Sequence, residues 1–208
     1  MKAHTKETQA SMTPETSVQA LKEGNIRFQN NFSADRNLLE QVKDTTTGQF
    51  PFATVLSCID SRIPVEMVFD QGIGDLFSVR IAGNFINDDI LGSMEFACKL
   101  AGSKVVVVLG HTSCGAVKGA CDGAELGKLT GMLNKIKPAV NAVTSPSEAA
   151  ERTSQNADFV NAVSAKNVEF SIDGIRSGSE VLAEMESNGE IMIVGAMYDV
   201  ASGKVTFS

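Results

Sequence analysis

Short apolar runs along the chain predict the strands of a buried β-sheet. Four such runs stand at 52–57, 76–81, 104–110 and 191–198. The run at 104–110 contains four consecutive valines without polar alternation, which is typical of a strand covered on both faces. A turn at 201–203 would return a fifth strand, at 204–207, as a hairpin partner.

Segments with helical spacing of apolar residues separate these strands. Thr13 and Pro14 form a helix-start signal, and the helix that follows is expected to end near Asn30. A second helix is expected over 88–101, with Gly102 as its stop signal. Further helical stretches are expected near 126–143, 147–167 and 171–187. Strands that alternate with helices predict an α/β fold, with a central, mostly parallel β-sheet that has an antiparallel edge strand and is flanked by helices.

One domain is expected over residues 14–208, because the chain has no internal repeat, no low-complexity tract and no clear linker. Residues 1–13 are polar and are expected to be disordered or loosely attached. They lack the apolar core of a signal peptide. No apolar run reaches the roughly 18 residues that a membrane span needs, so no membrane partner is expected.

The charge balance argues against one class of partner. The 208 residues include 18 basic and 25 acidic side chains, which gives a net charge of −7. A protein that binds nucleic acid through phosphates normally has the opposite balance, so no nucleic-acid partner is expected. The 4 cysteines are too few for a disulfide scaffold. A reducing, cytoplasmic location is therefore expected, where cysteines are free to bind metal.

Three potential metal ligands follow two of the predicted strands. Cys58 comes directly after the strand at 52–57, and His111 and Cys114 come after the valine-rich strand. If these strands are adjacent and parallel, their carboxyl ends bring the three side chains together. Two thiolates and one imidazole favour zinc, and three protein ligands leave one position open, as in catalytic zinc sites.

Asp60 and Arg62 stand beside the first of these ligands. If the chain stays extended beyond Cys58, then Cys58, Asp60 and Arg62 point to one side. Asp60 could then bind the metal as a fourth ligand and block it, or pair with Arg62 and leave the position to water. A plain ion pair that holds a turn is the structural alternative. Zinc lowers the pKa of bound water to about 7 in favourable sites, but two thiolates predict a smaller effect and a more alkaline optimum.

The other cysteines and the second histidine are weaker candidates. Cys98 falls in the apolar pattern of a helix and is expected in the core. Cys121 lies too far along its helix to share an ion with Cys114. His4 lies in the polar N-terminal segment.

The combination of Cys-x-Asp-x-Arg with a later His-x-x-Cys-Gly resembles the β-class carbonic anhydrases. The resemblance extends over about residues 15–205 and includes the segments 70–77, 79–84, 93–96 and 193–199. It implies reversible hydration of CO2 to bicarbonate by zinc-bound hydroxide, one Zn2+ per chain, and a homodimer or larger homo-oligomer in which the N-terminal helix packs on the partner subunit.

The resemblance also implies roles for single residues. Cys58, His111 and Cys114 would bind zinc, and Asp60 and Arg62 would be the catalytic pair. Four further residues would contact substrate: Gln49, Phe77, Phe96 and Gly115. Phe96 would be contributed across the dimer interface.

One position distinguishes two subgroups of this family. Some bacterial members bind bicarbonate at a second, inhibitory site through a tryptophan three residues before the first cysteine. Here that position is Val55, and the chain contains no tryptophan, so it resembles the plant-type subgroup. Two alternatives stay open: a CS2 or COS hydrolase that uses the same zinc site, and a non-catalytic zinc-binding module.

Overall fold

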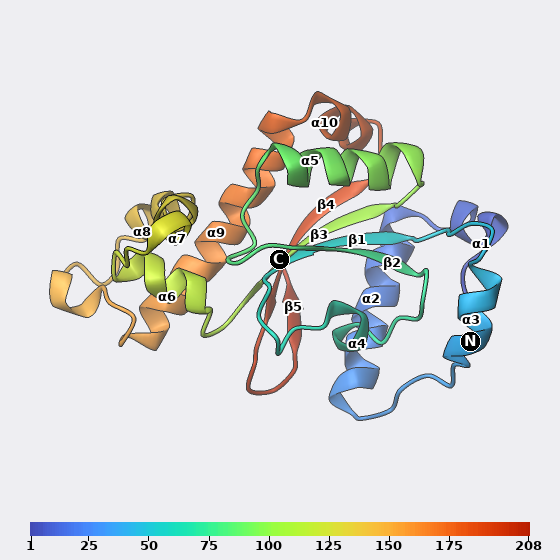
Figure 1. Cartoon of the computed structure of the whole chain (residues 1–208), viewed down its shortest axis with the longest axis horizontal. Helices are drawn as coiled ribbons and strands as arrows, with labels where there is room; N and C mark the ends of the chain where they lie inside the picture. Colours follow the sequence, from blue (N-terminus) through green and yellow to red (C-terminus); the bar gives the residue numbers. More distant parts are fainter.

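The computed structural model describes residues 1–208 and contains one five-stranded sheet in the order β2-β1-β3-β4-β5 (Figure 1). The strands are β1 (Ala53–Ser57), β2 (Leu76–Arg80), β3 (Val105–His111), β4 (Met192–Tyr198) and β5 (Val205–Phe207). β2, β1, β3 and β4 are parallel, whereas β5 is antiparallel to β4. The predicted sheet, including its antiparallel edge strand, is therefore confirmed.

The central strand β3 separates two apolar cores. All of its residues are buried. Val105, Val107 and Leu109 belong to one core, and Val106 and Val108 belong to the other. This alternation places every valine of the run against side chains, which explains the absence of polar positions.

Helices cover both faces of this sheet. The helical segments are α1 (Lys6–Ala10), α2 (Pro14–Gln29), α3 (Leu38–Asp44), α4 (Val65–Val68), α5 (Asp88–Glu95), the π-helix η1 (Phe96–Leu100), α6 (Gly115–Cys121), α7 (Gly127–Leu133), α8 (Lys137–Ala142), the 3-10 helix η2 (Ala149–Glu151), α9 (Ala157–Gly178) and α10 (Glu180–Ser187). α5 and α10 lie over one face, and α2 and α4 lie over the opposite face (Figure 1). α9 packs along β3 and β4 and contributes side chains to both cores.

The helices after β3 differ from the prediction. The stretch 126–143 is divided into α7 and α8, and the stretch expected from 147 becomes a long helix only at Ala157. Asn156 caps α9 by accepting the N–H of Phe159. Arg152 donates hydrogen bonds to the carbonyl oxygens of Val140 in α8 and of Val143 and Pro146 in the loop that follows α8, and these bonds hold the loop against the end of that helix.

The predicted break between 167 and 171 is also wrong, because α9 continues without interruption to Gly178. The break lies at Ser179, whose hydroxyl oxygen accepts the N–H of Leu182 and caps α10. Apolar residues on both sides of the predicted break belong to one continuous buried stripe, so spacing alone placed the boundary too early.

The N-terminal segment contains an element that the sequence analysis did not expect. The side chain of Thr5 accepts the N–H of Thr8 and caps α1. Gln9 is buried, and its Nε2 donates to the carbonyl oxygens of Pro51 and Ala101, both at 2.8 Å. Polar contacts therefore hold α1 next to β1. Such contacts leave no apolar periodicity in the sequence from which α1 could be predicted.

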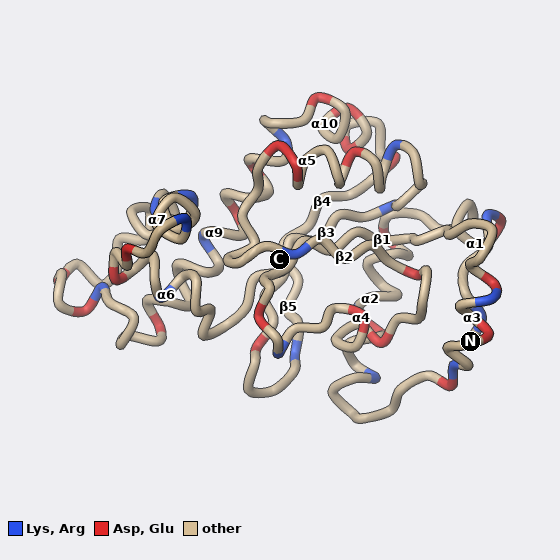
Figure 2. The backbone as a smooth tube through the Cα atoms, in the orientation of Figure 1, with Lys and Arg blue, Asp and Glu red and all other residues tan.

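Acidic residues gather on the neighbouring helices α5 and α10 (Figure 2). Their members are Asp88, Asp89, Glu95, Glu180, Glu184 and Glu186. One of them, Glu186, pairs with Arg176 of α9 at 2.8 Å.

No helix of the structure combines the length and the apolar character that crossing a membrane requires.

Candidate metal centre

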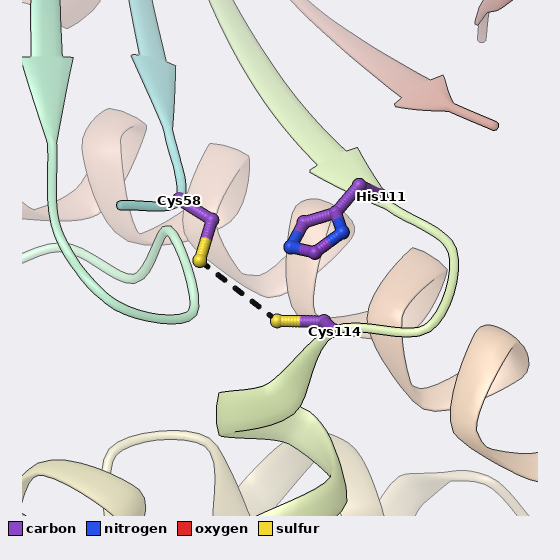
Figure 3. A group of neighbouring side chains, drawn as sticks. All are labelled: Cys58, His111 and Cys114. Carbon is purple, nitrogen blue, oxygen red and sulfur yellow. Dashed lines mark hydrogen bonds between the residues drawn. The ribbon is translucent and has the colours of Figure 1, made fainter. Parts of the chain in front are cut away.

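The carboxyl ends of β1 and β3 bring the three predicted ligands together (Figure 3). Cys58 directly follows β1, His111 is the last residue of β3, and Cys114 immediately precedes α6. Their ligand atoms all lie within 4.8 Å of one another, and all three residues are buried. The Sγ atoms of Cys58 and Cys114 are 4.0 Å apart. The expected adjacency of parallel strands is therefore present.

The imidazole of His111 is arranged as a metal ligand. Its Nδ1 lies 2.9 Å from the carbonyl oxygen of Thr112, and because a carbonyl only accepts, Nδ1 carries the proton. The other nitrogen, Nε2, is then an acceptor that is fully buried and has no hydrogen-bond partner. A buried polar atom without a partner costs about 1–3 kcal/mol. A cation between Nε2 and the two sulfurs would remove that cost, so the three residues fit a metal ion.

The two sulfurs form a hydrogen bond with each other. This hydrogen bond lowers the pKa of Cys58 to about 4 although burial opposes it. The same hydrogen bond, together with burial, raises the pKa of Cys114. Binding of a metal ion to both sulfurs would release the protons of the thiols.

Backbone and side-chain donors from the neighbouring strand fix the Cys58 loop. The N–H of Gly83 donates to Cys58 Sγ at 3.3 Å. Arg80, at the carboxyl end of β2, donates to the carbonyl oxygens of Cys58 at 3.0 Å and Asp60 at 2.7 Å. No role for Gly83 or Arg80 was predicted from the sequence. The signal that could have pointed to Arg80 is an arginine at the end of a predicted strand.

The loop between His111 and Cys114 is held from two sides. Ser113 adopts a positive φ of 57°, and its N–H donates to Asn161 Oδ1 of α9 at 3.0 Å. Thr112 Oγ1 donates to Asp199 and accepts the N–H of Val200. These contacts set the turn that brings two ligands from consecutive elements to one point.

Asp60 and Arg62 form a turn and do not continue the strand, which corrects the extended geometry expected for them. The N–H of Arg62 donates to Asp60 Oδ1 at 3.0 Å, and the N–H of Ile63 donates to the carbonyl oxygen of Asp60 at 3.1 Å. The side chains nevertheless pair, because Arg62 Nε and Nη2 donate to the two carboxylate oxygens at 2.9 and 2.7 Å. These hydrogen bonds hold the pKa of Asp60 well below its usual range. The carboxylate is thus ionised and engaged by Arg62.

The four residues expected to contact substrate do not gather around the ligands within one chain. Gln49 is exposed before the amino end of β1, whereas Cys58 follows its carboxyl end. Phe77 pairs in register with Thr54, four residues before Cys58, which corresponds to about 13 Å along the strand. Phe77 and Phe96 contact each other edge to face, with ring centroids 6.2 Å apart.

Gly115 alone of these four lies next to a ligand, at the start of α6. A Cβ added there would meet no atom within 4 Å, so the fold of this chain places no steric demand on the position. Its predicted role toward substrate remains a prediction.

The weaker candidates lie outside the cluster. Cys98 is buried in the core beneath α5 and α10, where burial raises the pKa of its thiol to about 12. Cys121 is at the far end of α6, and burial raises its pKa to about 11. His4 packs against Phe52, with ring centroids 5.2 Å apart, which is a packing role.

Comparison with known proteins finds sequences and structures that are similar to this chain. The family model described as carbonic anhydrase matches residues 53–205. A carbonic anhydrase of Mycolicibacterium smegmatis is 36% identical over 92% of this chain and 92% of its own length. The structure of a β-carbonic anhydrase of Aspergillus fumigatus superposes with a TM-score of 0.72 at 25% identity, covering 93% of this chain and 89% of that one.

Two further similarities concern assembly and substrate. The fold resembles a structure from Sordaria macrospora, described as one of two tetrameric β-carbonic anhydrases, with a TM-score of 0.69 at 22% identity, covering 93% of this chain and 94% of that one. A carbon disulfide hydrolase of Acidithiobacillus thiooxidans is 34% identical over only 34% of this chain and 36% of its own length.

Proposed function

Because the chain belongs to the β-class carbonic anhydrase family, whose reaction is the reversible hydration of CO2 to bicarbonate, we propose that Cys58, His111 and Cys114 bind one zinc ion per chain. The observation that carries the proposal is the convergence of two sulfurs on the unpartnered Nε2 of His111. Sulfur and imidazole donors together suit zinc among the common metals.

Zinc bound by three protein ligands would supply a Lewis acid with one free position, which lowers the pKa of water there and provides a nucleophile near neutral pH. Asp60 would accept a hydrogen bond from that nucleophile and so orient it toward CO2. Arg62 holds both carboxylate oxygens, and in this role it keeps Asp60 away from the metal. Of the sequence alternatives, this geometry favours the paired carboxylate over a fourth ligand.

The substrate pocket is proposed to form between two copies of the chain. Gln49 is exposed, and Phe96 is 53% exposed beside the open edge strand β2. An edge strand with free N–H and C=O groups is a natural place for a partner to pair. The tetrameric assembly described for the Sordaria proteins is consistent with a homodimer or larger oligomer here.

The subgroup and the location are proposed from single features. Val55 is fully buried in β1 where the inhibited bacterial members carry tryptophan, and this favours an enzyme without a second bicarbonate site. Strong bicarbonate inhibition with a sigmoidal pH dependence would contradict this. The buried free thiols favour a reducing, cytoplasmic location.

Stopped-flow CO2 hydration on protein of known zinc content tests the function. Measurements from about pH 6.5 to about pH 9 would cover the range in which water on zinc ionises. Fast turnover with one zinc per chain, rising toward alkaline pH, is expected. If zinc is present but CO2 is not hydrated, assays with COS and CS2 would identify the hydrolase alternative. The short match to the carbon disulfide hydrolase does not favour that outcome. Inactivity toward all three substrates would point to a non-catalytic zinc module.

A further inference from the structure

Helix α9 presents a row of polar side chains to the loop that carries His111 and Cys114 and to the turn at Gly83, whose N–H donates to Cys58 Sγ. Asn161 accepts the N–H of Ser113, Asn167 Nδ2 donates to the carbonyl oxygen of Gly83, and Ser171 Oγ donates to that of Asn84. Asn167 and Ser171 are each 3% exposed. Buried polar groups inside an apolar helix stripe are costly unless they are paired, and here their partners are loops and not the sheet.

Gly83 lies in a tight turn whose type sets the direction of the Gly83 N–H. The N–H of Asn84 donates to the carbonyl oxygen of Ile81, and Gly83 has a φ of 80°, so residues 81–84 form a type II turn. A Cβ at Gly83 would lie 2.4 Å from Ile136 Cδ1, so the turn packs closely against the residue that precedes α8.

This turn aims the N–H of Gly83 at Cys58 Sγ, 3.3 Å away. In the related type I turn the preceding peptide is flipped, and a carbonyl oxygen would face the sulfur in place of the N–H. An N–H stabilises a thiolate, whereas a carbonyl oxygen repels it.

Asn167 holds Gly83 through the other polar group of the same residue, its carbonyl oxygen. Its Nδ2 holds the carbonyl oxygen of Gly83 at 2.8 Å, and Ser171 holds that of Asn84 at 3.1 Å. These bonds fix the two peptides on the C-terminal side of Gly83 and so fix the place from which its N–H extends toward the sulfur. The chain of contacts therefore runs from α9 through the Gly83 turn to the Cys58 sulfur.

We propose that Asn167 is a positioning residue for the metal centre: by holding the Gly83 turn it keeps a backbone donor on the Cys58 sulfur and thereby strengthens zinc binding. Asn161 performs the matching task on the loop between His111 and Cys114. The inference rests on the proposed zinc site. Groups that hydrogen-bond to metal ligands typically change metal affinity by about 10–100-fold when they are removed.

The test compares Asn167→Leu with wild type and with a matched control, Ser164→Ala. Ser164 is buried on the same helix, but its hydroxyl donates only to Val160 within that helix. Zinc affinity is measured by competition with a chromophoric chelator, at a temperature where circular dichroism shows each metal-free protein to be folded. Cobalt(II) is then substituted, and the sulfur-to-cobalt charge-transfer absorption is recorded.

Asn167→Leu should bind zinc about 10-fold more weakly, at the low end of that range, because Asn167 acts through the Gly83 donor. Its charge-transfer band should move to longer wavelength, because a thiolate that loses a hydrogen bond gives up electrons more easily. Ser164→Ala should match wild type in both measurements. An unchanged band and an affinity within about twofold of wild type would overturn the proposal, including when Asn167→Leu lowers the melting temperature.

If Asn167→Leu does not fold, Ser171→Ala decides by the same band: a shift to longer wavelength supports the proposal, and an unshifted band overturns it. A wild-type chain that binds no zinc would overturn the metal site itself and this inference with it. Normal zinc binding by both wild type and Asn167→Leu would overturn the positioning role alone.

Discussion

Arg62 donates two parallel hydrogen bonds to the carboxylate of Asp60, from Nε to Oδ1 at 2.9 Å and from Nη2 to Oδ2 at 2.7 Å. The backbone N–H of Arg62 adds a third bond to Oδ1, so one residue supplies all three donors. Asp60 is thereby kept ionised and acts only as an acceptor. That is the property which a residue orienting a proton-bearing nucleophile requires.

Replacing Asp60 by Asn should lower CO2 hydration by roughly 100-fold, because a neutral amide breaks the bidentate pair and presents a donor as readily as an acceptor. Zinc content should be unchanged, since the three ligands do not include Asp60. Stopped-flow turnover and metal analysis measure both. Asp122→Asn is the control, because Asp122 also accepts a backbone N–H but lies beyond the far end of α6. Full turnover in Asp60→Asn would remove the proposed role.

Removing a sulfur ligand should abolish zinc binding. Cys58→Ala or Cys114→Ala leaves two ligands, and zinc per chain should fall from about one to near zero with loss of activity. Cys98→Ala is the matched control, because Cys98 is as buried as the ligands but belongs to the core beneath α5 and α10. Metal analysis after gel filtration checks each protein. Zinc retained by Cys58→Ala would mean that the cluster is not the site.

The metal ligands could be located from sequence because strand order in a parallel sheet determines which loops meet. Cys58 and His111 each follow an apolar run, and the two runs became adjacent strands. The contacts of Asn167 and Gly83 could not be located in this way. They depend on the rotational setting of α9 against a turn 84 residues away in the chain, which no local pattern encodes.

The strands were predictable to within a residue or so, but the helices after β3 were not. Apolar spacing reports that a face is buried and says little about where a helix starts. Those starts depend on single polar contacts, namely the Asn156 and Ser179 caps and the Arg152 bonds to loop carbonyls. The turn at Asp60 was missed for the same reason, since the Asp60 side chain accepts the backbone N–H of Arg62 and this local bond forms a turn.

Gly24 should not tolerate a side chain. A Cβ at this position of α2 would lie 1.8 Å from the carbonyl oxygen of Phe69, and a backbone atom cannot move aside cheaply. Gly24→Ala should therefore destabilise the protein by about 3 kcal/mol. Gly131→Ala is the control, because nothing lies within 4 Å of a Cβ there and alanine should stabilise α7 by roughly 0.5–1 kcal/mol. Urea unfolding measures both, and equal effects would contradict the close approach.

Asp70 should make stability fall in acid. Burial raises the pKa of Asp70, but hydrogen bonds from Arg27, Arg36 and the N–H of Ala34 outweigh burial and lower it overall. A lowered folded-state pKa contributes stability above the unfolded value of about 3.9, and this contribution is lost as the pH falls through the folded-state pKa. At neutral pH, Asp70→Asn should cost about 3 kcal/mol, because Arg36 is also buried.

The free-energy difference between wild type and Asp70→Asn should shrink below about pH 4. Urea unfolding of both proteins, each freed of metal by a chelator, isolates this effect from acid release of zinc. A difference that stays constant from neutral pH down to about pH 2.5 would show that the charge of Asp70 contributes nothing.

Mixing two inactive variants should restore activity if the substrate pocket is shared between subunits. Gln49 and Cys58 lie beyond opposite ends of β1, a strand on the order of 15 Å long, so Gln49 cannot serve the metal centre of its own chain. Gln49→Ala keeps its ligands, and Cys58→Ala keeps its glutamine. In a mixed dimer with the proposed shared pocket, the ligands of the first chain would face the glutamine of the second.

Refolding the two variants together in equal amounts should therefore return about a quarter of wild-type turnover, because half of the dimers are mixed and each holds one complete site. Cys58→Ala mixed with Cys114→Ala is the control, and it should stay inactive because all three ligands come from one chain. No recovery in the first mixture, with mixed dimers demonstrated by differently tagged chains, would place the action of Gln49 elsewhere. Recovery would show that a second copy of the chain completes the site, and it would support the open edge of the sheet as the surface where the two copies meet.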